Sequence, residues 1–423
     1  MYMELFVKEE TLEKRSLKEK VIRGVLALQH LIAMFGATVL VPMLTGLDPS
    51  VALFTAGAGT LIFHICTKGK VPVFLGSSFA FISVINAVKA DYGDLRYAQG
   101  GMLVAGLLFV VASFVIKKIG VDKVKRILPA QVVGPMIMVI GLNLIPTAIG
   151  MAQKGVLLAA ITLGTALIVR FLGRGFTRQI SILIAVGVGY ILALIMGYVD
   201  TNAIGEAAFF ATPNFTLPKF NIGAIMIIAP VVLAVFMEHV GDITTNGTVV
   251  GKNFIENPGL NRTFLGDGLA TIMASFLGGP ANTTYGENTG VLAVTKNYDP
   301  SILRITALFA IGLSFISKFG VAIRTIPEPV MGGISIMLFS MITIVGPKTI
   351  KSEKVKMNLK NIIVMGSIIF VGLIAPYLNP MLQENFGFIV GINITDTVSI
   401  SGLSLAAIVG VVMNLILNGI NKK

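Results

Sequence analysis

The amino-acid sequence predicts an all-α polytopic membrane protein of about fourteen transmembrane helices, built as an inverted repeat of seven plus seven. Three observations predict this fold class. First, 55% of the 423 residues are hydrophobic and 13% are charged, whereas soluble globular chains carry about 25% charged residues. Second, apolar runs long enough to cross a hydrocarbon core of about 30 Å recur along the chain. Third, a motif in the first half recurs in the second.

The apolar runs locate the spans, of which the third and the tenth fit poorly as continuous helices. We expect spans near 22–43, 50–66, 72–88, 98–116, 128–149, 155–171, 179–199, 222–243, 263–279, 281–295, 301–320, 329–347, 361–378 and 401–419. With the N-terminus inside, most of the 33 Lys and Arg residues fall in the segments predicted to face the cytoplasm, as the positive-inside rule expects. Both termini are therefore predicted to be cytoplasmic, and the net charge of +12 reflects topology rather than nucleic-acid binding.

An internal repeat indicates how the spans are organised. Residues 126–138 read RILPAQVVGPMIM and residues 324–336 read RTIPEPVMGGISI, so Arg, Pro, Val and Gly recur in register. Each copy would hold seven helices, an odd number, so the second copy must enter the membrane upside down. Inverted repeats are typical of secondary transporters, whose substrate binds near mid-membrane where the copies meet. Two weaker echoes follow the same order: Gln29-His30 with Glu238-His239, and SSFA (77–80) with TTYG (283–286).

The two poorly helical spans occupy matching places in the two halves. They read VPVFLGSSFAFI (71–82) and GGPANTTYGENTGVLAVT (278–295), and both carry a Gly or Pro break beside small polar residues. Interrupted segments at matching positions indicate a transporter's binding site, since freed backbone groups can bind a ligand in a cavity. A half-helix starting near Tyr285 or Gly286 would also direct its positive dipole end at that ligand. The alternative is a helix kink packed against neighbouring helices.

Ionisable side chains gather near the same segments. A charge within a span costs a few kcal/mol or more and is a candidate for function. Glu238 and Asp242 are four residues apart and share a helix face, whereas His239 points roughly 100° away. The acidic and histidine side chains within or near the spans are His30, His64, Glu238, His239, Asp242, Asp267 and Glu287.

The alternatives differ among these residues. His30 and His239 could equally be hydrogen-bonding residues in helix packing, and His64 and Asp267 are expected near the inner membrane face. An ionised carboxylate only accepts hydrogen bonds, so Glu238 and Glu287 suit a neutral ligand rich in N–H donors, or a cation. A buried carboxyl group is also a candidate proton carrier.

Several classes of chemistry find no support in the sequence. A single cysteine, Cys66, excludes an intramolecular disulfide and a multi-cysteine metal site. There is no compact carboxylate cluster for Ca²⁺ and no GxxxxGK[ST] loop for nucleotide phosphates. No nucleophile–base pair stands out. We therefore expect no metal, no cofactor, no ATP-driven pumping and no enzyme activity.

At five motifs the sequence resembles a known family, the nucleobase–cation symporters, also called nucleobase/ascorbate transporters, and most closely their bacterial uracil permeases. The resemblance runs through nearly the whole chain and implies a fourteen-helix, seven-plus-seven fold with short antiparallel strands within the third and tenth spans. The motifs are QHLIAMFGATVLVP (29–42), GKVPVFLGSSFAFI (69–82), EHVGD (238–242), NTTYGENTGV (282–291) and PEPVMGG (327–333).

The resemblance also implies a division into two units. A core domain would comprise residues 1–120 and 206–323, which hold spans 1–4 and 8–11. A gate domain would comprise residues 121–205 and 324–423, which hold spans 5–7 and 12–14. The protein would lie in the cytoplasmic (inner) membrane and form a homodimer through its gate domains.

The implied function is import of uracil by proton symport. Glu238 and Glu287 match the family's substrate-contacting carboxylates, and Phe79 and Gly286 match positions where main-chain amides meet the nucleobase. Uracil fits these carboxylates and main-chain amides, since its flat ring carries two N–H donors and two carbonyl acceptors. The neighbouring Ser78 and Tyr285 complete the expected substrate site.

Proton coupling is assigned to Asp242 and Glu238, with His239 and His30 as further candidates. Uracil permeases often have histidine where this chain has Asp242, and purine-type members commonly have aspartate there. Conversely, purine-type members usually have glutamine at the position of Glu287. Glu287 therefore favours uracil, whereas Asp242 makes a xanthine or urate permease the first alternative. An anion transporter of the related sulfate-permease fold is less favoured, because two ionised carboxylates repel an anion. Sodium is the competing coupling ion.

Overall fold

The computed structural model describes residues 16–393 and 399–419. Within them, seven helical segments are long and apolar enough to cross a membrane, which makes the chain a multi-pass membrane protein. These segments are α3 (Leu17–Thr45), α4 (Pro49–Cys66), α6 (Leu95–Ile119), α8 (Ala130–Gln153), α13–α14 (Ile222–Val250), α19 (Glu328–Ser352) and α20–α21 (Leu359–Phe386). Four shorter apolar helices accompany them: α9 (Val156–Leu172), α11 (Ser181–Ile195), α17 (Pro300–Ser314) and α22 (Gly402–Asn418).

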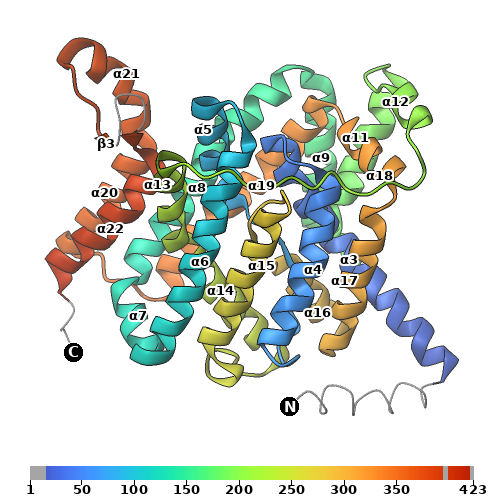
Figure 1. Cartoon of the computed structure of the whole chain (residues 1–423), viewed down its shortest axis with the longest axis horizontal. Coiled ribbons are helices and arrows are strands. Elements are labelled where there is room, and N and C mark those ends of the chain that lie inside the picture. The colour runs from blue at the N-terminus through green and yellow to red at the C-terminus, as the bar shows by residue number, and fades with distance from the viewer. Residues whose placement is uncertain (1–15, 394–398, 420–423) are drawn as a thin grey trace.

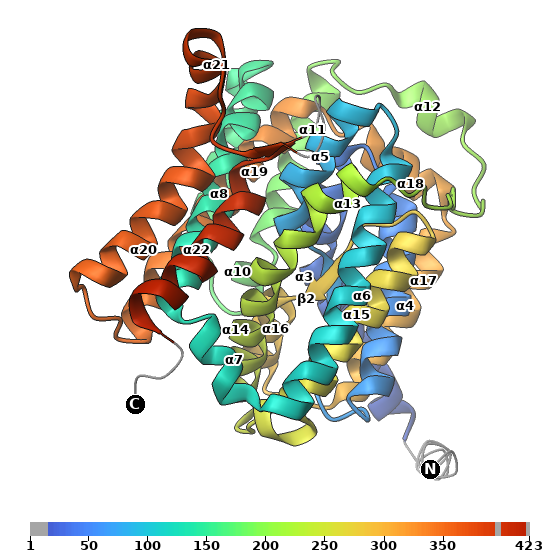
Figure 2. The ribbon, with the colours of Figure 1, turned by 60° about the vertical axis from the view of Figure 1, so that its left-hand side comes forward.

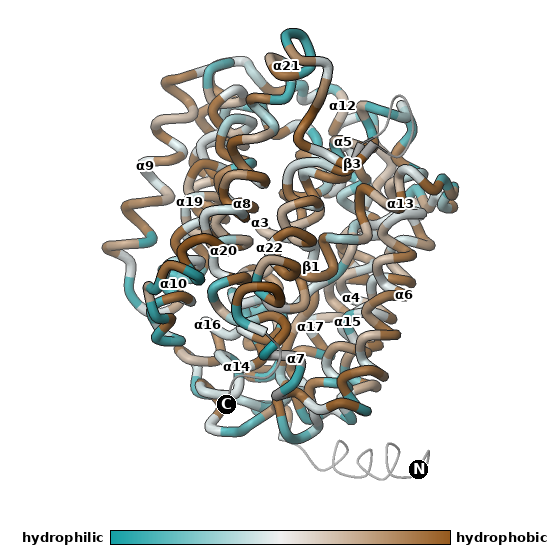
Figure 3. The backbone as a smooth tube through the Cα atoms, turned by 90° about the vertical axis from the view of Figure 1, so that its left-hand side faces the viewer, coloured by the Kyte–Doolittle hydropathy of each residue, from teal (hydrophilic) through white to brown (hydrophobic). Residues whose placement is uncertain are grey.

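The helices stand side by side as a bundle (Figure 1). Hydrophobic residues dominate its middle, and hydrophilic stretches gather toward its two ends (Figure 3). Two of the long segments are interrupted. The eighth predicted span consists of α13 (Ile222–Ile228), a 3₁₀ turn η2 (Ala229–Val231) and α14 (Val232–Val250), and the thirteenth of α20 (Leu359–Ile369), a π-helical turn η4 (Phe370–Ile374) and α21 (Ala375–Phe386).

Shorter elements complete the described chain. Those next to the centre of the bundle are β1 (Leu75–Ser77), η1 (Phe79–Phe81), α5 (Ile82–Tyr92), α15 (Leu260–Phe276), β2 (Asn282–Thr284) and α16 (Gly286–Thr295). The connecting elements are α7 (Val121–Ile127), α10 (Phe176–Gln179), α12 (Thr201–Glu206), η3 (Ile255–Gly259), α18 (Ser317–Arg324), β3 (Ile392–Asn393) and β4 (Ser399–Ile400).

A two-stranded antiparallel sheet lies at the centre of the bundle. Strand β1 falls in the predicted third span and β2 in the tenth, with Gly76 opposite Thr283. Each strand leads directly into a short helix: β1 into η1 and α5, and β2 into α16. The two breaks predicted from Gly and Pro are thus places where extended segments from the two halves pair with each other.

A threonine hydroxyl from a neighbouring helix satisfies the outer edge of each strand. Thr60 of α4 accepts a hydrogen bond from the Leu75 N–H at 2.9 Å and lies 3.5 Å from the Leu75 carbonyl oxygen. In the same way, Thr271 of α15 accepts from the Asn282 N–H at 3.2 Å and donates to the Asn282 carbonyl at 3.0 Å. Both threonines are fully buried. These two hydroxyls therefore attach the sheet to α4 and α15 where water is excluded.

Helix packing follows a two-fold pattern. Helix α4 packs on α17, and its counterpart α15 packs on α6. Helix α9 packs on α11 and α19, while α20 packs on α22 and α8. Three further contacts, α4 with α15, α8 with α19 and β1 with β2, join each element to its own counterpart.

The repeated motif falls on equivalent places in this pattern. Pro129 is the residue before α8 and Pro327 is the residue before α19, both in an extended conformation. The short helices that precede them, α7 and α18, lie at opposite ends of the bundle (Figures 1 and 2). The repeated glycines allow α8 and α19 to approach closely, because a Cβ on Gly134 would lie 2.9 Å from the Gly346 oxygen and one on Gly332 would lie 2.4 Å from a main-chain nitrogen of α8.

Two large clusters of buried apolar side chains fill the bundle. One centres on Phe109, Phe236 and Phe264, whose neighbouring ring centroids are 4.9 Å apart. The other contains Met34 and Phe339. Aromatic pairs at this distance add to the stabilisation from burial.

Outside the spans, Asp299 caps α17 and ties it to α3. Its carboxylate accepts hydrogen bonds from the Ser301 N–H at 2.9 Å and from the Arg23 guanidinium at 2.5 Å. Burial alone would raise the pKa of Asp299, but the hydrogen bonds from Ser301 and Arg23 outweigh it and hold the pKa at about 2. The cap is therefore fully charged at neutral pH.

Candidate functional site

The sheet directs two half-helices toward one region of the interior. The 3₁₀ turn η1 begins at Phe79 and α16 begins at Gly286, where a half-helix start was predicted. The first N–H groups of a helix have no partner within it, and they carry the positive end of its dipole. A Cβ built on Gly286 would meet only Asp242 Oδ1, at 3.9 Å. The main chain at the start of α16 is therefore open to a ligand.

Two adjoining cavities meet at this region. The larger has a volume of about 740 Å³ and lies between α14, α8 and α19. It extends to the α7–α8 junction and the α19–α20 link, toward the end of the bundle where α7 lies (Figure 1). The smaller has a volume of about 280 Å³ and is bordered by residues 283–287. Phe79, Glu238 and Asp242 line both cavities and so mark their junction.

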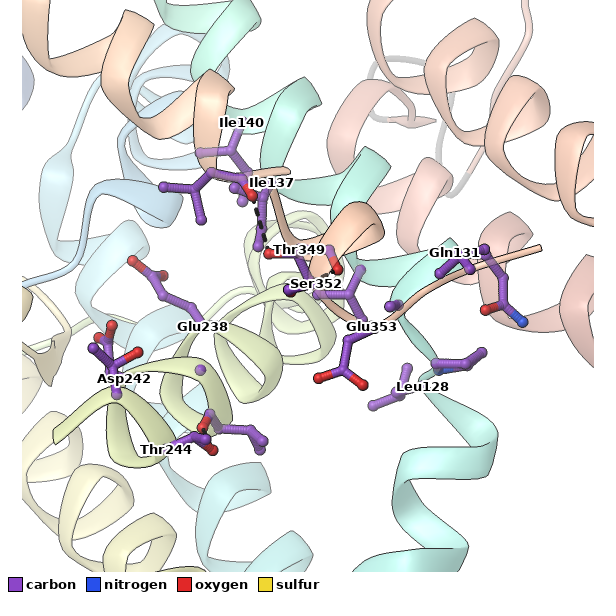
Figure 4. A pocket seen from close by; sticks show the side chains of 18 of the residues that line it. Leu128, Gln131, Ile137, Ile140, Glu238, Asp242, Thr244, Thr349, Ser352 and Glu353 are labelled. Carbon is purple, nitrogen blue, oxygen red and sulfur yellow. Dashed lines mark hydrogen bonds between the residues drawn. The ribbon is translucent and has the colours of Figure 1, made fainter. Parts of the chain in front are cut away.

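Glu238 and Asp242 project from one face of α14, as their spacing predicted (Figure 4). Across the cavity, Ile137 lies on α8 and Thr349 on α19 (Figure 4). Both carboxylates are half-buried. Thr284 of β2 donates a hydrogen bond to Asp242 Oδ2 at 3.0 Å, so the sheet positions one of the two carboxylates.

Glu287 approaches from the other side, in the first turn of α16. It is half-buried and lines the smaller cavity together with Glu238 and Asp242. An acidic residue in the first turn of a helix is stabilised by the helix dipole and the free N–H groups. Three carboxylates from two helices therefore face one cavity.

Most of the predicted substrate residues converge here, with one difference. Phe79, Gly286 and Tyr285 line the smaller cavity. The hydroxyl of Tyr285 donates to the Ser77 carbonyl at 2.9 Å, so its ring is fixed against β1. Ser78 is fully buried next to Phe79 and does not line either cavity. Its part in substrate binding stays a prediction.

The two histidines predicted for proton coupling lie in helix-packing contacts away from both cavities. The His30 ring and main-chain carbonyl face the Asn288 amide, at 3.2 and 3.1 Å. His239 is fully buried, with Nδ1 2.8 Å from Asp267 Oδ2 and Nε2 2.9 Å from Thr263 Oγ1. These contacts match the alternative interpretation of both residues, and their role in coupling stays a prediction.

Two residues that the sequence placed near the inner membrane face are enclosed by protein. Asp267 is completely buried and paired with His239. His64 is 3% exposed, and its Nε2 lies 2.9 Å from the Val73 carbonyl oxygen. In residues 16–393 and 399–419, the structure contains no group of three or more His, Cys, Asp or Glu side chains that could hold a metal ion.

The sequence interpretation missed the opposite wall of the smaller cavity. Arg170 of α9 and Gln179 of α10 line it. Gln179 also packs tightly on α16, since a Cβ on Gly290 would lie 2.3 Å from its Oε1. An arginine within the apolar sixth span was the available signal for Arg170. Nothing local in the sequence marks Gln179.

Comparison with known proteins adds to this geometry. Residues 23–381 match the sequence profile described as the Permease family. The chain is 41% identical over 410 residues to the uracil permease of Bacillus caldolyticus, covering 93% of this chain and 91% of the relative. It is 39% identical to the probable uracil permease of Haemophilus influenzae, with 95% of both chains covered. It is also 39% identical to the uracil permease of Escherichia coli K12, covering 92% of this chain and 90% of the relative.

Solved structures share the fold at much lower identity. The transmembrane domain of the cyanobacterial bicarbonate transporter BicA superposes with a TM-score of 0.60 at 16% identity, covering 83% of this chain and 94% of that one. The murine anion transporter Slc26a9, in its inward-facing state, superposes with a TM-score of 0.67 at 12% identity, covering 97% of this chain and 70% of that one. These likenesses concern the fold alone.

Proposed function

We propose that this chain, which belongs to the nucleobase permease family and is a transporter rather than an enzyme, imports uracil across the cytoplasmic membrane by proton symport. The observation that carries the proposal is the convergence of Glu238 and Glu287 on one cavity, beside the open main chain at Gly286. Relatives at 39–41% identity over nearly the whole chain are named uracil permeases.

The chemistry of uracil suits this cavity. Each ring N–H would donate to a carboxylate, Glu238 on one side and Glu287 on the other. The carbonyl oxygens would accept from main-chain N–H groups at the starts of η1 and α16, near Phe79 and Gly286, where the helix dipoles favour negative charge. Hydrogen bonds to charged groups contribute about 1.5–3 kcal/mol each, which makes the carboxylates the strongest anchors for a neutral ligand.

The coupling proton would be carried by Glu238 and Asp242. These two carboxylates lie one helical turn apart on α14 and line the same cavities. Like charges at this distance disfavour double ionisation, so the pair would hold one proton between them. Thr284 fixes Asp242 through a hydrogen bond, which leaves Glu238 the freer of the two to meet the substrate.

The topology proposed for this function has fourteen spans in two inverted sets of seven, with both termini in the cytoplasm. The core domain would comprise 1–120 and 206–323, and the gate domain 121–205 and 324–423. The two-fold packing pattern and the opposite placement of α7 and α18 support this arrangement. On this topology the larger cavity opens to the cytoplasm, and the gate domains would form the homodimer contact.

Two other substrate classes, purines and small anions, are alternatives to uracil. Asp242 occupies a position where purine-type members commonly have aspartate, which favours a xanthine or urate permease. The solved neighbours are named bicarbonate and anion transporters, but three carboxylates around the cavity disfavour an anionic substrate.

Uptake into proteoliposomes tests the function. Radiolabelled uracil, xanthine and bicarbonate are offered under an imposed pH gradient and, separately, an imposed Na⁺ gradient. We expect accumulation of uracil driven by the pH gradient. Accumulation of xanthine without uracil would assign the purine alternative, and uptake driven only by Na⁺ would overturn proton symport.

A further inference from the structure

The smaller cavity contains one positively charged side chain among its described lining residues. Arg170 lies in the last turn of α9, two residues before the helix ends at Leu172, and it is half-buried. It shares the cavity wall with Glu238, Asp242 and Glu287. A guanidinium that lines a cavity among carboxylates calls for a reason, because charged side chains within a span face a cavity or a partner.

Arg170 makes no hydrogen bond or ion pair within the described part of the chain, so its charge acts through space. Arg178 on α10 repels it, and Glu287 attracts it. Arg178 is exposed and does not line the cavity. The carboxylate most affected by Arg170 is therefore the one in the first turn of α16.

We propose that Arg170 is a positioning residue of the substrate site, whose guanidinium stabilises the ionised carboxylate of Glu287 as a hydrogen-bond acceptor for a ring N–H. This inference rests on the proposed function and assigns different tasks to the three carboxylates. Glu287 stays charged and binds, whereas Glu238 and Asp242 share the proton. Without a nearby cation, all three would compete for protons in one cavity.

The surroundings of Glu287 support this division. Glu238 and Asp242 face it from α14 and disfavour its charge, and His30 on α3 contacts the adjacent Asn288 rather than the cavity. Arg170 is the cation that lines the cavity with it. The free N–H groups at the start of α16 favour the same ionised carboxylate, and the attraction of Arg170 adds to their effect.

A ligand-free measurement tests the inference separately from the function. Infrared titration of the purified full chain follows the carboxyl band that disappears in Glu287→Gln. In Arg170→Gln we expect this carboxylate to take up its proton at a higher pH than in wild type, and Arg170→Lys should restore the wild-type titration. Arg178→Gln is the matched control and should leave the band unchanged. An identical Glu287 titration in wild type and Arg170→Gln would overturn the proposal.

Uracil calorimetry gives the second readout. Arg170→Gln should weaken binding about tenfold, the equivalent of about 1.4 kcal/mol, with the loss growing as pH falls. In a Glu287→Gln background the same change should alter affinity less than about twofold, because coupled residues do not act additively. Equal losses in both backgrounds would indicate a merely structural arginine and overturn the proposal. If wild type binds no uracil while the infrared shift is present, the proposed function fails and the charge pair stands.

Discussion

Thr271→Val tests whether the buried threonine hydroxyls hold the central sheet in place. The change removes the partner of both the N–H and the carbonyl of Asn282, at 3.2 and 3.0 Å. Thr271 is fully buried, so water cannot replace it. Leaving a buried polar group unsatisfied costs about 1–3 kcal/mol, and the added methyl group regains part of this. We expect a net loss of stability of about 2–4 kcal/mol.

Three other threonine variants serve as comparisons for Thr271→Val. Thr60→Val, at the equivalent place on α4, should cost less, because only one of its two contacts with Leu75 is short. Thr271→Ser keeps the hydroxyl and should lose about 1 kcal/mol for the missing methyl group. Thr165→Val, on the exposed side of α9, removes a bond only to its own helix, to Ile161, and should change stability little.

Thermal unfolding in detergent, followed by circular dichroism, measures the loss, and uracil calorimetry measures its effect on the site. Asn282 lies four residues before Gly286 on the same segment, so displacement of β2 should also weaken uracil binding. Thr271→Val with wild-type melting and wild-type affinity would refute the anchoring role. A loss of stability in Thr165→Val equal to that in Thr271→Val would also refute the anchoring role.

Four further predictions concern single residues. Glu287→Gln should reduce uracil affinity about ten- to hundredfold, since a charge-assisted hydrogen bond is lost; unchanged calorimetry would contradict its assignment. Asp242→Asn should abolish accumulation driven by a pH gradient while leaving binding and exchange intact, and normal accumulation in vesicles would exclude its coupling role. Gly76→Ala would place a Cβ 2.3 Å from the Tyr285 ring, and overpacking of about 1–3 kcal/mol should lower both melting temperature and uracil affinity; a wild-type melting curve would disprove the clash. The pKa of Asp299 is lowered to about 2 from an ordinary 3.8, so the stabilisation by its carboxylate is complete above about pH 4 and is lost as pH falls toward 2. Asp299→Asn should therefore destabilise the chain at pH 7 and flatten this acid dependence of stability. An unchanged pH profile of stability would count against the role of Asp299.

Sequence patterns predicted the parts of the site that depend on local spacing. Glu238 and Asp242 are four positions apart, and the 3.6-residue period of a helix places both on one face. The small polar residues around Gly286 predicted a half-helix start, and α16 begins there. Each inference needed only the covalent chain and the geometry of one element. For that reason each could be made before any tertiary contact was known.

Contacts between distant segments could not be predicted in the same way. Thr60 and Thr271 look like ordinary threonines in apolar helices, and only the folded chain places them beside the strands. His239, a candidate for proton coupling, contacts Asp267 on another helix. No local sequence pattern reveals this neighbour, and the coupling role of His239 stays a prediction.

The contacts at the site divide it between two sets of helices. The sheet is attached to α4 and α15 by threonines, and Thr284 attaches Asp242 to the same sheet. Helix α9, which carries Arg170, packs instead on α8, α11 and α19. A movement of α9 relative to α16 would therefore change the charge next to Glu287 while leaving the Thr284–Asp242 bond intact. Because Coulomb energy falls with distance, such a movement would make the strength of Glu287 as a hydrogen-bond acceptor depend on conformation, so that substrate affinity would change while the proton stays with Glu238 and Asp242.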